Sequence, residues 1–256
     1  MPSPLFDLTN KVALVTGSHR GIGFAIAREL GLAGARVVVS SNEAEGCRNA
    51  AAELERESIT AKAIVCDVGV DAELDRLVEE TRAAFGAIDI LVCNAGINPH
   101  FGSLLDATDE EYDAIMHVNL RSQVQLCRRV VPAMAARKSG SVILTSSISG
   151  LRGNAKIGVY ALSKAALAQV ARNLAVEFGP SNVRVNAISP GLIRTEFATP
   201  ILGNAEGLEK RLLKTPLRRV GEAREIAGAA VFLASDAGAF VTGHNLVVDG
   251  GTVISD

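Results

Sequence analysis

The sequence predicts a doubly wound α/β fold, in which helices cover both faces of a parallel β-sheet. Short apolar runs alternate with longer amphipathic segments along the chain, as in consecutive βαβ units. Within the runs, successive residues are apolar, which is typical of strands that are buried on both faces. The chain has 256 residues, 48% hydrophobic and 21% charged, enough for a large core. We therefore expect one domain over residues 1–256, and less readily two small ones.

The first predicted unit contains a glycine-rich loop. A buried strand at 12–16 is followed by Gly17, Gly21 and Gly23, and an amphipathic helix then leads to a second strand at 36–40. The spacing G-x-x-x-G-x-G differs from the commoner G-x-G-x-x-G, and alone it could equally mark a tight turn. Within a βαβ unit it predicts a pyrophosphate site, because the first N–H groups of a helix lack intrahelical partners.

The later elements continue the alternation. We expect helices at about 43–57, 72–85, 109–137 and 222–235, and one more from Val159 onward. Strands are expected at 61–66, 88–93, 141–145 and 245–249, and a further strand ends at Pro190. Thr108 is the expected N-cap of the helix at 109–137. Asn119 within that helix indicates a kink or a buried polar role, or it could be a satisfied surface Asn. Residues 196–213 are irregular and suggest one or two short amphipathic helices.

Polar or small residues follow the predicted strands, at the edge where ligands of such sheets bind. Asp67 could accept a hydrogen bond from an adenine amino group, or it could cap the next helix. Asn94, Ala95 and Gly96 could present bare backbone to a nucleoside, or form an ordinary turn. The other strand ends read Ser146-Ser147 and Ser189-Pro190-Gly191.

Tyr160 and Lys164 stand one turn apart on the same face of a predicted helix. A Y-x-x-x-K pattern arises by chance in roughly one chain in twenty of this composition, so its position after a strand end matters. A lysine ammonium at this distance would favour the tyrosinate and lower the pKa of Tyr160 from its usual value near 10.

Together these motifs resemble the classical short-chain dehydrogenase/reductase family over nearly the whole chain. The residues that carry the resemblance are T-G-S-H-R-G-I-G at 16–23, Asp67-Val68, N-A-G at 94–96, Asn119, Ser147, Tyr160, Lys164 and P-G-L-I-R-T at 190–195. Cys93 departs from the usual Asn at that position, which should cost little because the backbone of that turn makes most of the contacts in the family. The resemblance implies a Rossmann-like domain with a seven-stranded parallel sheet, and it is strongest to 3-oxoacyl-carrier-protein reductases and carbonyl reductases.

The resemblance also implies an oxidoreductase that transfers a hydride between a nicotinamide cofactor and a ketone or secondary alcohol. In the family pattern Tyr160 would be the general acid/base, and Ser147 would donate a hydrogen bond to the substrate oxygen. Lys164 would support Tyr160 and bond the nicotinamide ribose, and Asn119 would support a water in a proton path. A non-catalytic dinucleotide-binding sensor or scaffold on the same fold is the alternative, since fold alone does not decide.

The cofactor contacts that the family pattern carries over extend from the glycine loop to the sixth strand. They are Gly17, His19, Arg20, Gly21, Ile22, Gly23, Ser41, Asn42, Asp67, Val68, Asn94, Ala95, Gly96, Tyr160, Lys164, Pro190, Gly191, Ile193 and Thr195.

The cofactor preference depends on the residues that follow the second strand. Ser41 stands where NAD-preferring enzymes place a carboxylate, and Arg20 is placed to pair with a 2′-phosphate. Against this, Asn42 replaces a second arginine, Glu43 adds a negative charge, and Arg20 could be a solvated loop residue. We expect NADP(H) to be preferred, with NAD(H) as the alternative.

The substrate is expected to lie under a covering segment at about 192–219. Residues 98–101, Leu151, Arg152, Asn154 and 196–213 should line its pocket, and their mix suggests a substrate with an apolar body and few charges. The identity and stereochemistry of the substrate, and the direction of the reaction, do not follow from the sequence.

Composition excludes several classes of partner. The net charge of -2 gives no basis for binding nucleic acid or an anionic membrane, and no apolar run approaches the ~18 residues of a membrane span. The first ten residues do not resemble a signal peptide, so a cytoplasmic protein is expected. The four histidines and the cysteines at 47, 66, 93 and 127 show no metal-ligand spacing, so we expect no metal and reduced thiols.

A homotetramer is expected from the resemblance. The helices from Asp109 and Val159 carry small and apolar residues beyond one core-facing stripe, for example at Ala165, Ala166, Ala168 and Val176.

Overall fold

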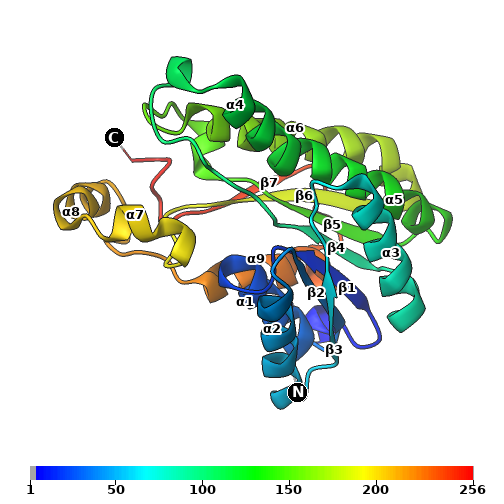
Figure 1. Cartoon of the computed structure of the whole chain (residues 1–256). Helices are drawn as coiled ribbons and strands as arrows, with labels where there is room; N and C mark the ends of the chain where they lie inside the picture. The colour runs from blue at the N-terminus through cyan, green and yellow to red at the C-terminus, as the bar shows by residue number, and fades with distance from the viewer. Residues whose placement is uncertain (1–3, 256) are drawn as a thin grey trace.

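The computed structural model describes residues 4–255 and contains a seven-stranded parallel sheet with the order β3-β2-β1-β4-β5-β6-β7 (Figure 1). The doubly wound fold is confirmed. The strands are β1 Val12–Thr16, β2 Arg36–Ser41, β3 Ala61–Val65, β4 Ile90–Cys93, β5 Gly140–Thr145, β6 Val183–Pro190 and β7 Asn245–Val248.

Helices pack on both faces of the sheet, with α1, α2 and α9 on one side and α3, α5 and α6 on the other (Figure 1). The helices are α1 Gly21–Leu32, α2 Ala44–Arg56, α3 Asp71–Phe85, α4 Asp109–Met116, α5 Ser122–Ala136, α6 Gly158–Phe178, α7 Thr199–Leu202, α8 Ala205–Leu213 and α9 Ala223–Ala234. No helix among residues 4–255 combines the length and the apolar character that crossing a membrane requires.

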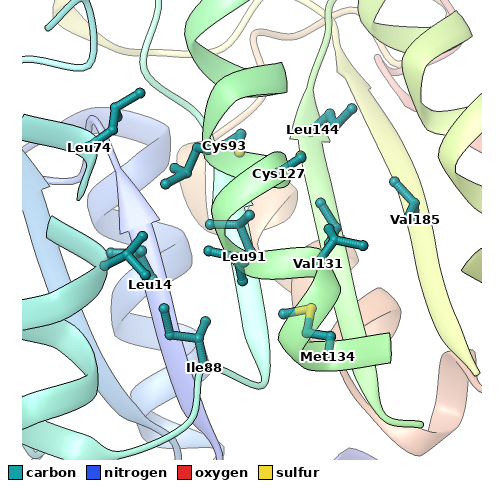
Figure 2. Close-up of a cluster of buried hydrophobic side chains, with 14 of the residues drawn as sticks. Leu14, Leu74, Ile88, Leu91, Cys93, Cys127, Val131, Met134, Leu144 and Val185 are labelled. Carbon is teal, nitrogen blue, oxygen red and sulfur yellow. The ribbon is translucent and has the colours of Figure 1, made fainter. Parts of the chain in front are cut away.

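Side chains alternate between the two faces of the sheet along the strands, so the strands contribute to the hydrophobic cores on both faces. Leu14 packs toward α3, α5 and α6, whereas its neighbours Ala13 and Val15 pack toward α1 and α9. Each fully buried leucine contributes about 1.5–3 kcal/mol relative to an exposed one. Figure 2 shows Leu14, Leu91 and Leu144, which come from three adjacent strands and lie on the same face of the sheet.

Cys93 also belongs to this core. Its side chain lies beside Cys127 of α5 and is fully buried (Figure 2). Burial and the neighbouring thiol raise the pKa of Cys93. The side chain thus points into the core between the sheet and the helices α3, α5 and α6, and all four cysteines are buried free thiols.

The helix expected at 109–137 is divided in the structure. A π-helical turn, His117–Arg121, separates α4 from α5. It places Asn119 where it is 0% exposed and bonded at both ends of its amide, so the buried polar role is confirmed. Thr108 caps α4 in a capping box with Glu111, as predicted.

Several strand boundaries differ from the predictions by one or two residues, and one residue that was expected on the surface is buried. The strand expected from Ile88 starts at Ile90, and the carboxylate of the preceding Asp89 accepts from the N–H of Val12, 3.0 Å away. The strand expected to reach Cys66 ends at Val65. Ala168 was expected on the surface of the Tyr160 helix, but it is 5% exposed and packs inward.

Candidate active site

A cleft of about 750 Å³ opens at the carboxyl edge of the sheet, where strand order reverses between β1 and β4. This is the switch point at which doubly wound sheets bind ligands. Its lining consists of Gly17, His19, Arg20, Gly21, Ile22, Gly23, Ser41, Asn42, Glu43, Cys66, Asp67, Val68, Asn94, Ala95, Gly96, Ile97, Val118, Thr145, Tyr160, Lys164, Thr195, Glu196 and Phe197.

The glycine loop forms the floor of the cleft. Gly17 and Gly21 have φ of 61° and 59°, a conformation that side chains disfavour. A Cβ on Gly23 would collide with the carbonyl oxygen of Gly17, so the helix α1 can approach the loop only with glycine there. The N-cap residue Arg20 makes no side-chain bond to the first turn of α1. The N–H groups of that turn therefore remain available to an anion in the cleft.

The turn after β4 is bonded to this loop. The Asn94 side chain donates to the carbonyl oxygens of Thr16 (3.1 Å) and Gly17 (3.0 Å), while the Thr16 hydroxyl accepts from the N–H groups of Asn94 and Ala95. Asn94 thus holds the two loops together and leaves backbone facing the cleft.

Asp67 does not cap the following helix. Its carboxylate accepts from the N–H of Gly69 at 2.8 Å, and Val70 occupies the N-cap position of α3. Asp67 lines the cleft beside Val68. Of the two interpretations offered by the sequence, helix capping is wrong.

Lys164 lies in the first turns of α6 and is 2% exposed. Its Nζ donates to the carbonyl oxygen of Thr145 at the end of β5, 2.7 Å away, and lies 5.5 Å from the centre of the Tyr160 ring. Burial without a carboxylate partner lowers the pKa of Lys164 to about 8. At neutral pH the ammonium form still predominates.

The pKa of Tyr160 differs from the sequence-based expectation. Burial of its hydroxyl raises the pKa to about 12, and hydrogen bonding with Ser147 offsets only part of this increase. The expected lowering is therefore wrong, because burial outweighs the other effects on the pKa of this hydroxyl. Tyr160 is therefore a phenol at neutral pH, a proton donor rather than a tyrosinate.

Ser147 and Asn119 are not among the residues that line the cleft. The Ser147 hydroxyl accepts from the N–H and the hydroxyl of Ser149, at 3.1 and 2.9 Å. It also hydrogen-bonds with the Tyr160 hydroxyl. Asn119 holds the backbone of Ile97 through two bonds and donates to Ser163 of α6. It therefore connects the turn after β4 with the helix of Tyr160.

Most of the charged side chains of the cleft lie around Arg20, at the other end from Tyr160. Arg20 pairs with Glu196 at 2.9 Å and with Glu43 at 3.4 Å, all three side chains being about half exposed or more. His19 lies 3.3 Å from Glu43 without hydrogen-bond geometry, and burial lowers its pKa. The buried hydroxyl of Ser41 accepts from the N–H of Glu43 at 2.9 Å, so it holds the start of α2.

Most of the predicted residues line the cleft, and five do not: Asn119, Ser147, Pro190, Gly191 and Ile193. Gly191 packs against Asp249, and Ile193 is buried beside Gly221. Five lining residues fall outside the predictions: Glu43, Cys66, Ile97, Val118 and Thr145. Glu196 and Phe197 belong to the segment 196–213 that was expected to line the substrate pocket, whereas residues 98–101, Leu151, Arg152 and Asn154, also expected there, do not line this cleft. Thr145 and Cys66 stand at or just after strand ends, a signal that could have included them. Glu196 and Phe197 reach the cleft only because the chain beyond β6 folds back, with the Phe197 ring 5.9 Å from that of Tyr160.

Comparison with known proteins gives consistent matches. A family model described as enoyl-(acyl carrier protein) reductase matches residues 17–253. Dehydrogenase/reductase SDR family member 4 of Sus scrofa is 42% identical over 245 residues, 96% of this chain and 88% of that protein.

Two solved structures are similar over nearly their whole length. One is a gluconate 5-dehydrogenase from Burkholderia cenocepacia in complex with NADP and tartrate, with TM-score 0.94, 33% identity and 99% coverage of each chain. The other is a 7α-hydroxysteroid dehydrogenase complexed with NADH and 7-oxoglycochenodeoxycholic acid, with TM-score 0.94, 34% identity and coverage of 98% and 97%.

Proposed function

The chain belongs to the classical short-chain dehydrogenase/reductase family, and on that basis we propose that it transfers a hydride between NADP(H) and a ketone or secondary alcohol. One observation carries the proposal. A protonated Tyr160, supported by the Ser147 hydroxyl and the Lys164 ammonium, faces a cleft whose floor is a glycine loop at a helix N-terminus.

The lining fits a dinucleotide. Among the described residues, the buried Thr145 hydroxyl lacks a hydrogen-bond partner, and the first turn of α1 is uncapped. The glycine loop would hold the pyrophosphate, Asp67 and Val68 the adenine, Lys164 and Tyr160 the nicotinamide ribose, and Thr195 the carboxamide. When bound, the nicotinamide ring supplies or accepts the hydride.

In this proposal, residues of the chain itself transfer the proton to the substrate. Tyr160 would give its phenolic proton to the ketone oxygen, and Ser147 would donate a hydrogen bond as negative charge develops there. The buried ammonium of Lys164 would stabilise the resulting tyrosinate electrostatically, an effect that low local dielectric strengthens. Asn119 would hold the turn at Ile97 and the helix α6 in their relative positions.

A ketone panel assayed with both reduced cofactors tests the proposal against the non-catalytic alternative. We expect oxidation of the cofactor that depends on the ketone. A sensor or scaffold would bind the cofactor with measurable affinity and oxidise none of it, and that result would reject the enzyme.

The NADP(H) preference rests on Arg20 and Ser41. Arg20→Ala is expected to raise the KM for NADPH by about 10- to 100-fold and to leave that for NADH nearly unchanged, because a charge-assisted contact with a 2′-phosphate is worth ~1.5–3 kcal/mol. Ser41→Asp should shift preference toward NADH, since a carboxylate repels that phosphate and can keep the bond to the Glu43 N–H. Steady-state kinetics with both cofactors measures these changes.

The ion pairs of Arg20 supply a matched test. Glu196→Gln removes one competitor for the guanidinium and should tighten NADPH binding by up to about fivefold without affecting NADH, since exposed pairs are worth about 0–1 kcal/mol. A wild-type kcat/KM that is higher with NADH than with NADPH would refute the preference.

The assembly that we propose is a homotetramer. Val176 is 81% exposed on α6 and Leu162 of the same helix is also exposed, which leaves apolar surface for a second copy. A monomer mass by light scattering at micromolar concentration would exclude it.

A further inference from the structure

His100 lies in the loop that follows β4 and is 8% exposed. Both of its ring nitrogens face oxygen atoms. Nδ1 lies 2.9 Å from the Glu111 carboxylate of α4, and Nε2 lies 2.8 Å from the carbonyl oxygen of Ser103. The side chain therefore connects two parts of its own loop with the first turn of α4.

These contacts suit the protonated form of the ring. A neutral imidazole has one N–H, so one nitrogen would turn a lone pair toward an oxygen at hydrogen-bond distance, whereas an imidazolium donates to both oxygens. The same Glu111 oxygen also accepts from the N–H of Thr108 at 3.0 Å, as an ionised carboxylate does. The bonds to Ser103 and to Glu111 raise the pKa of His100.

Charged groups from three segments surround the ring of His100. Glu111 of α4 is in contact with it, and Asp106, in the 3-10 turn at the end of the loop, also favours its proton. Lys156, from the segment before α6, has its Nζ 5.8 Å from the centre of the Phe101 ring. The other acidic residues in the first turn of α4 are exposed, Asp109 and Glu110. Both carboxylates that act on the ring thus stabilise its cation.

The loop that His100 holds begins in the cleft. Ile97 lines the cleft, and its N–H and carbonyl oxygen are both bonded to the Asn119 amide, at 2.7 and 2.9 Å. His100 then attaches the same loop to α4, which lies beside α6 (Figure 1). A change in the bonds of His100 therefore acts on backbone that is close to the cleft.

The other half of the loop packs on the start of α6. Gly102 pairs with Ile157 in an isolated β-bridge just before the helix. A Cβ on Gly158 would come within 2.9 Å of the Leu104 side chain, so only a glycine allows the loop to lie this close. Tyr160 follows in the same helical turn. The loop thus connects His100 with the helix that carries the proposed acid.

We propose that His100 is a positioning residue that responds to pH. As an imidazolium it holds the loop 97–106 against α4 and the start of α6, and loss of its proton releases one of its two bonds and loosens the loop beside Tyr160. Its stabilising effect is complete below about pH 6.5, the usual pKa of histidine, and is lost as pH rises through the raised pKa of the folded protein. The effect on the ketone rests on the proposed function, whereas the effect on the loop does not.

Histidine NMR tests the charge of the ring directly. In protein labelled with ¹⁵N at its four histidines, we expect a titration midpoint of His100 above the usual value near 6.5. His100→Gln assigns the signal. His244→Gln, at an exposed position before β7, is the matched control and should leave the signal unchanged. A midpoint at or below 6.5 would overturn the proposal.

Glu111→Gln separates the charge of this residue from its part in the helix cap. Glutamine also fits the N3 position of a capping box, so α4 should keep its first turn. The negative charge beside the ring is lost, and the titration midpoint of His100 should fall. An unchanged midpoint would contradict the role of the carboxylate and with it the proposed clamp.

Hydrogen exchange reports on the loop without turnover. The N–H groups of Ile97 and Gly102 are both bonded, that of Gly102 to the carbonyl oxygen of Lys156 at 2.9 Å. In the wild type we expect their protection factors to fall about tenfold as pH rises through the titration of His100, the lower end of the range for a charge-assisted bond. In His100→Gln they should be low at every pH. The same pH-dependent fall in His100→Gln would reject the proposal.

Ketone kinetics connect the loop with the active site. The wild-type KM for a ketone should rise about three- to tenfold over the same pH range, part of the tenfold or more that a charge-assisted bond contributes, and should be high at every pH in His100→Gln. A wild-type KM that stays constant while the loop loses protection would overturn the positioning role. Protein that reduces no ketone but shows both the titration and the exchange effect would reject the proposed function and support the clamp.

Discussion

Tyr160→Phe is expected to lower kcat by about 10²- to 10⁴-fold, the usual contribution of a positioned general acid, while the Kd of the cofactor changes no more than a few-fold. Phenylalanine keeps the ring beside Phe197, 5.9 Å between centroids, and loses only the hydroxyl. Because the pKa of that hydroxyl is about 12, the wild-type group carries its proton throughout the neutral range. Steady-state kinetics and cofactor fluorescence titration measure the two quantities.

The second tyrosine of the chain is the matched control. Tyr112 is exposed on α4, so Tyr112→Phe should leave kcat unchanged. If Tyr160→Phe retained more than about a tenth of the wild-type rate, the assignment of Tyr160 as the acid would be wrong.

Lys164→Met is expected to reduce both turnover and cofactor affinity, by about 10²-fold or more in kcat and about tenfold in Kd. Methionine fills the buried volume of the stem but cannot donate to the Thr145 carbonyl or supply a charge next to Tyr160. Loss of a donor from a buried pair costs the desolvation of the remaining acceptor as well, about 1–3 kcal/mol. Lys11→Met, at an exposed position before β1, is the control and should behave as wild type.

The pH profile adds a readout that a purely structural role of Lys164 would not affect. Burial lowers its pKa to about 8, so ketone reduction should fall as pH rises through 8 and the ammonium is lost. The Lys164→Met variant should lack this decline. An unchanged profile in the variant would show that another group titrates.

Several features of this protein follow from the sequence alone, because they depend on neighbours along the chain. Continuous apolar runs predicted the strands and a period of 3.6 residues predicted the helices, and the glycine spacing predicted the loop whose Gly23 approaches the carbonyl of Gly17. The i,i+4 spacing of Tyr160 and Lys164 placed them on one helix face without knowledge of the fold.

Contacts between distant segments were decided only by the tertiary structure. Lys164 of α6 donates to the carbonyl of Thr145 at the end of β5, and burial of the Tyr160 hydroxyl leaves its pKa high instead of low. The π-helical turn that buries Asn119 and the ion pair of Arg20 with Glu196 depend likewise on packing across the sheet edge. Residue types and local periods determine which elements form, whereas burial and charge at a site depend on which elements meet.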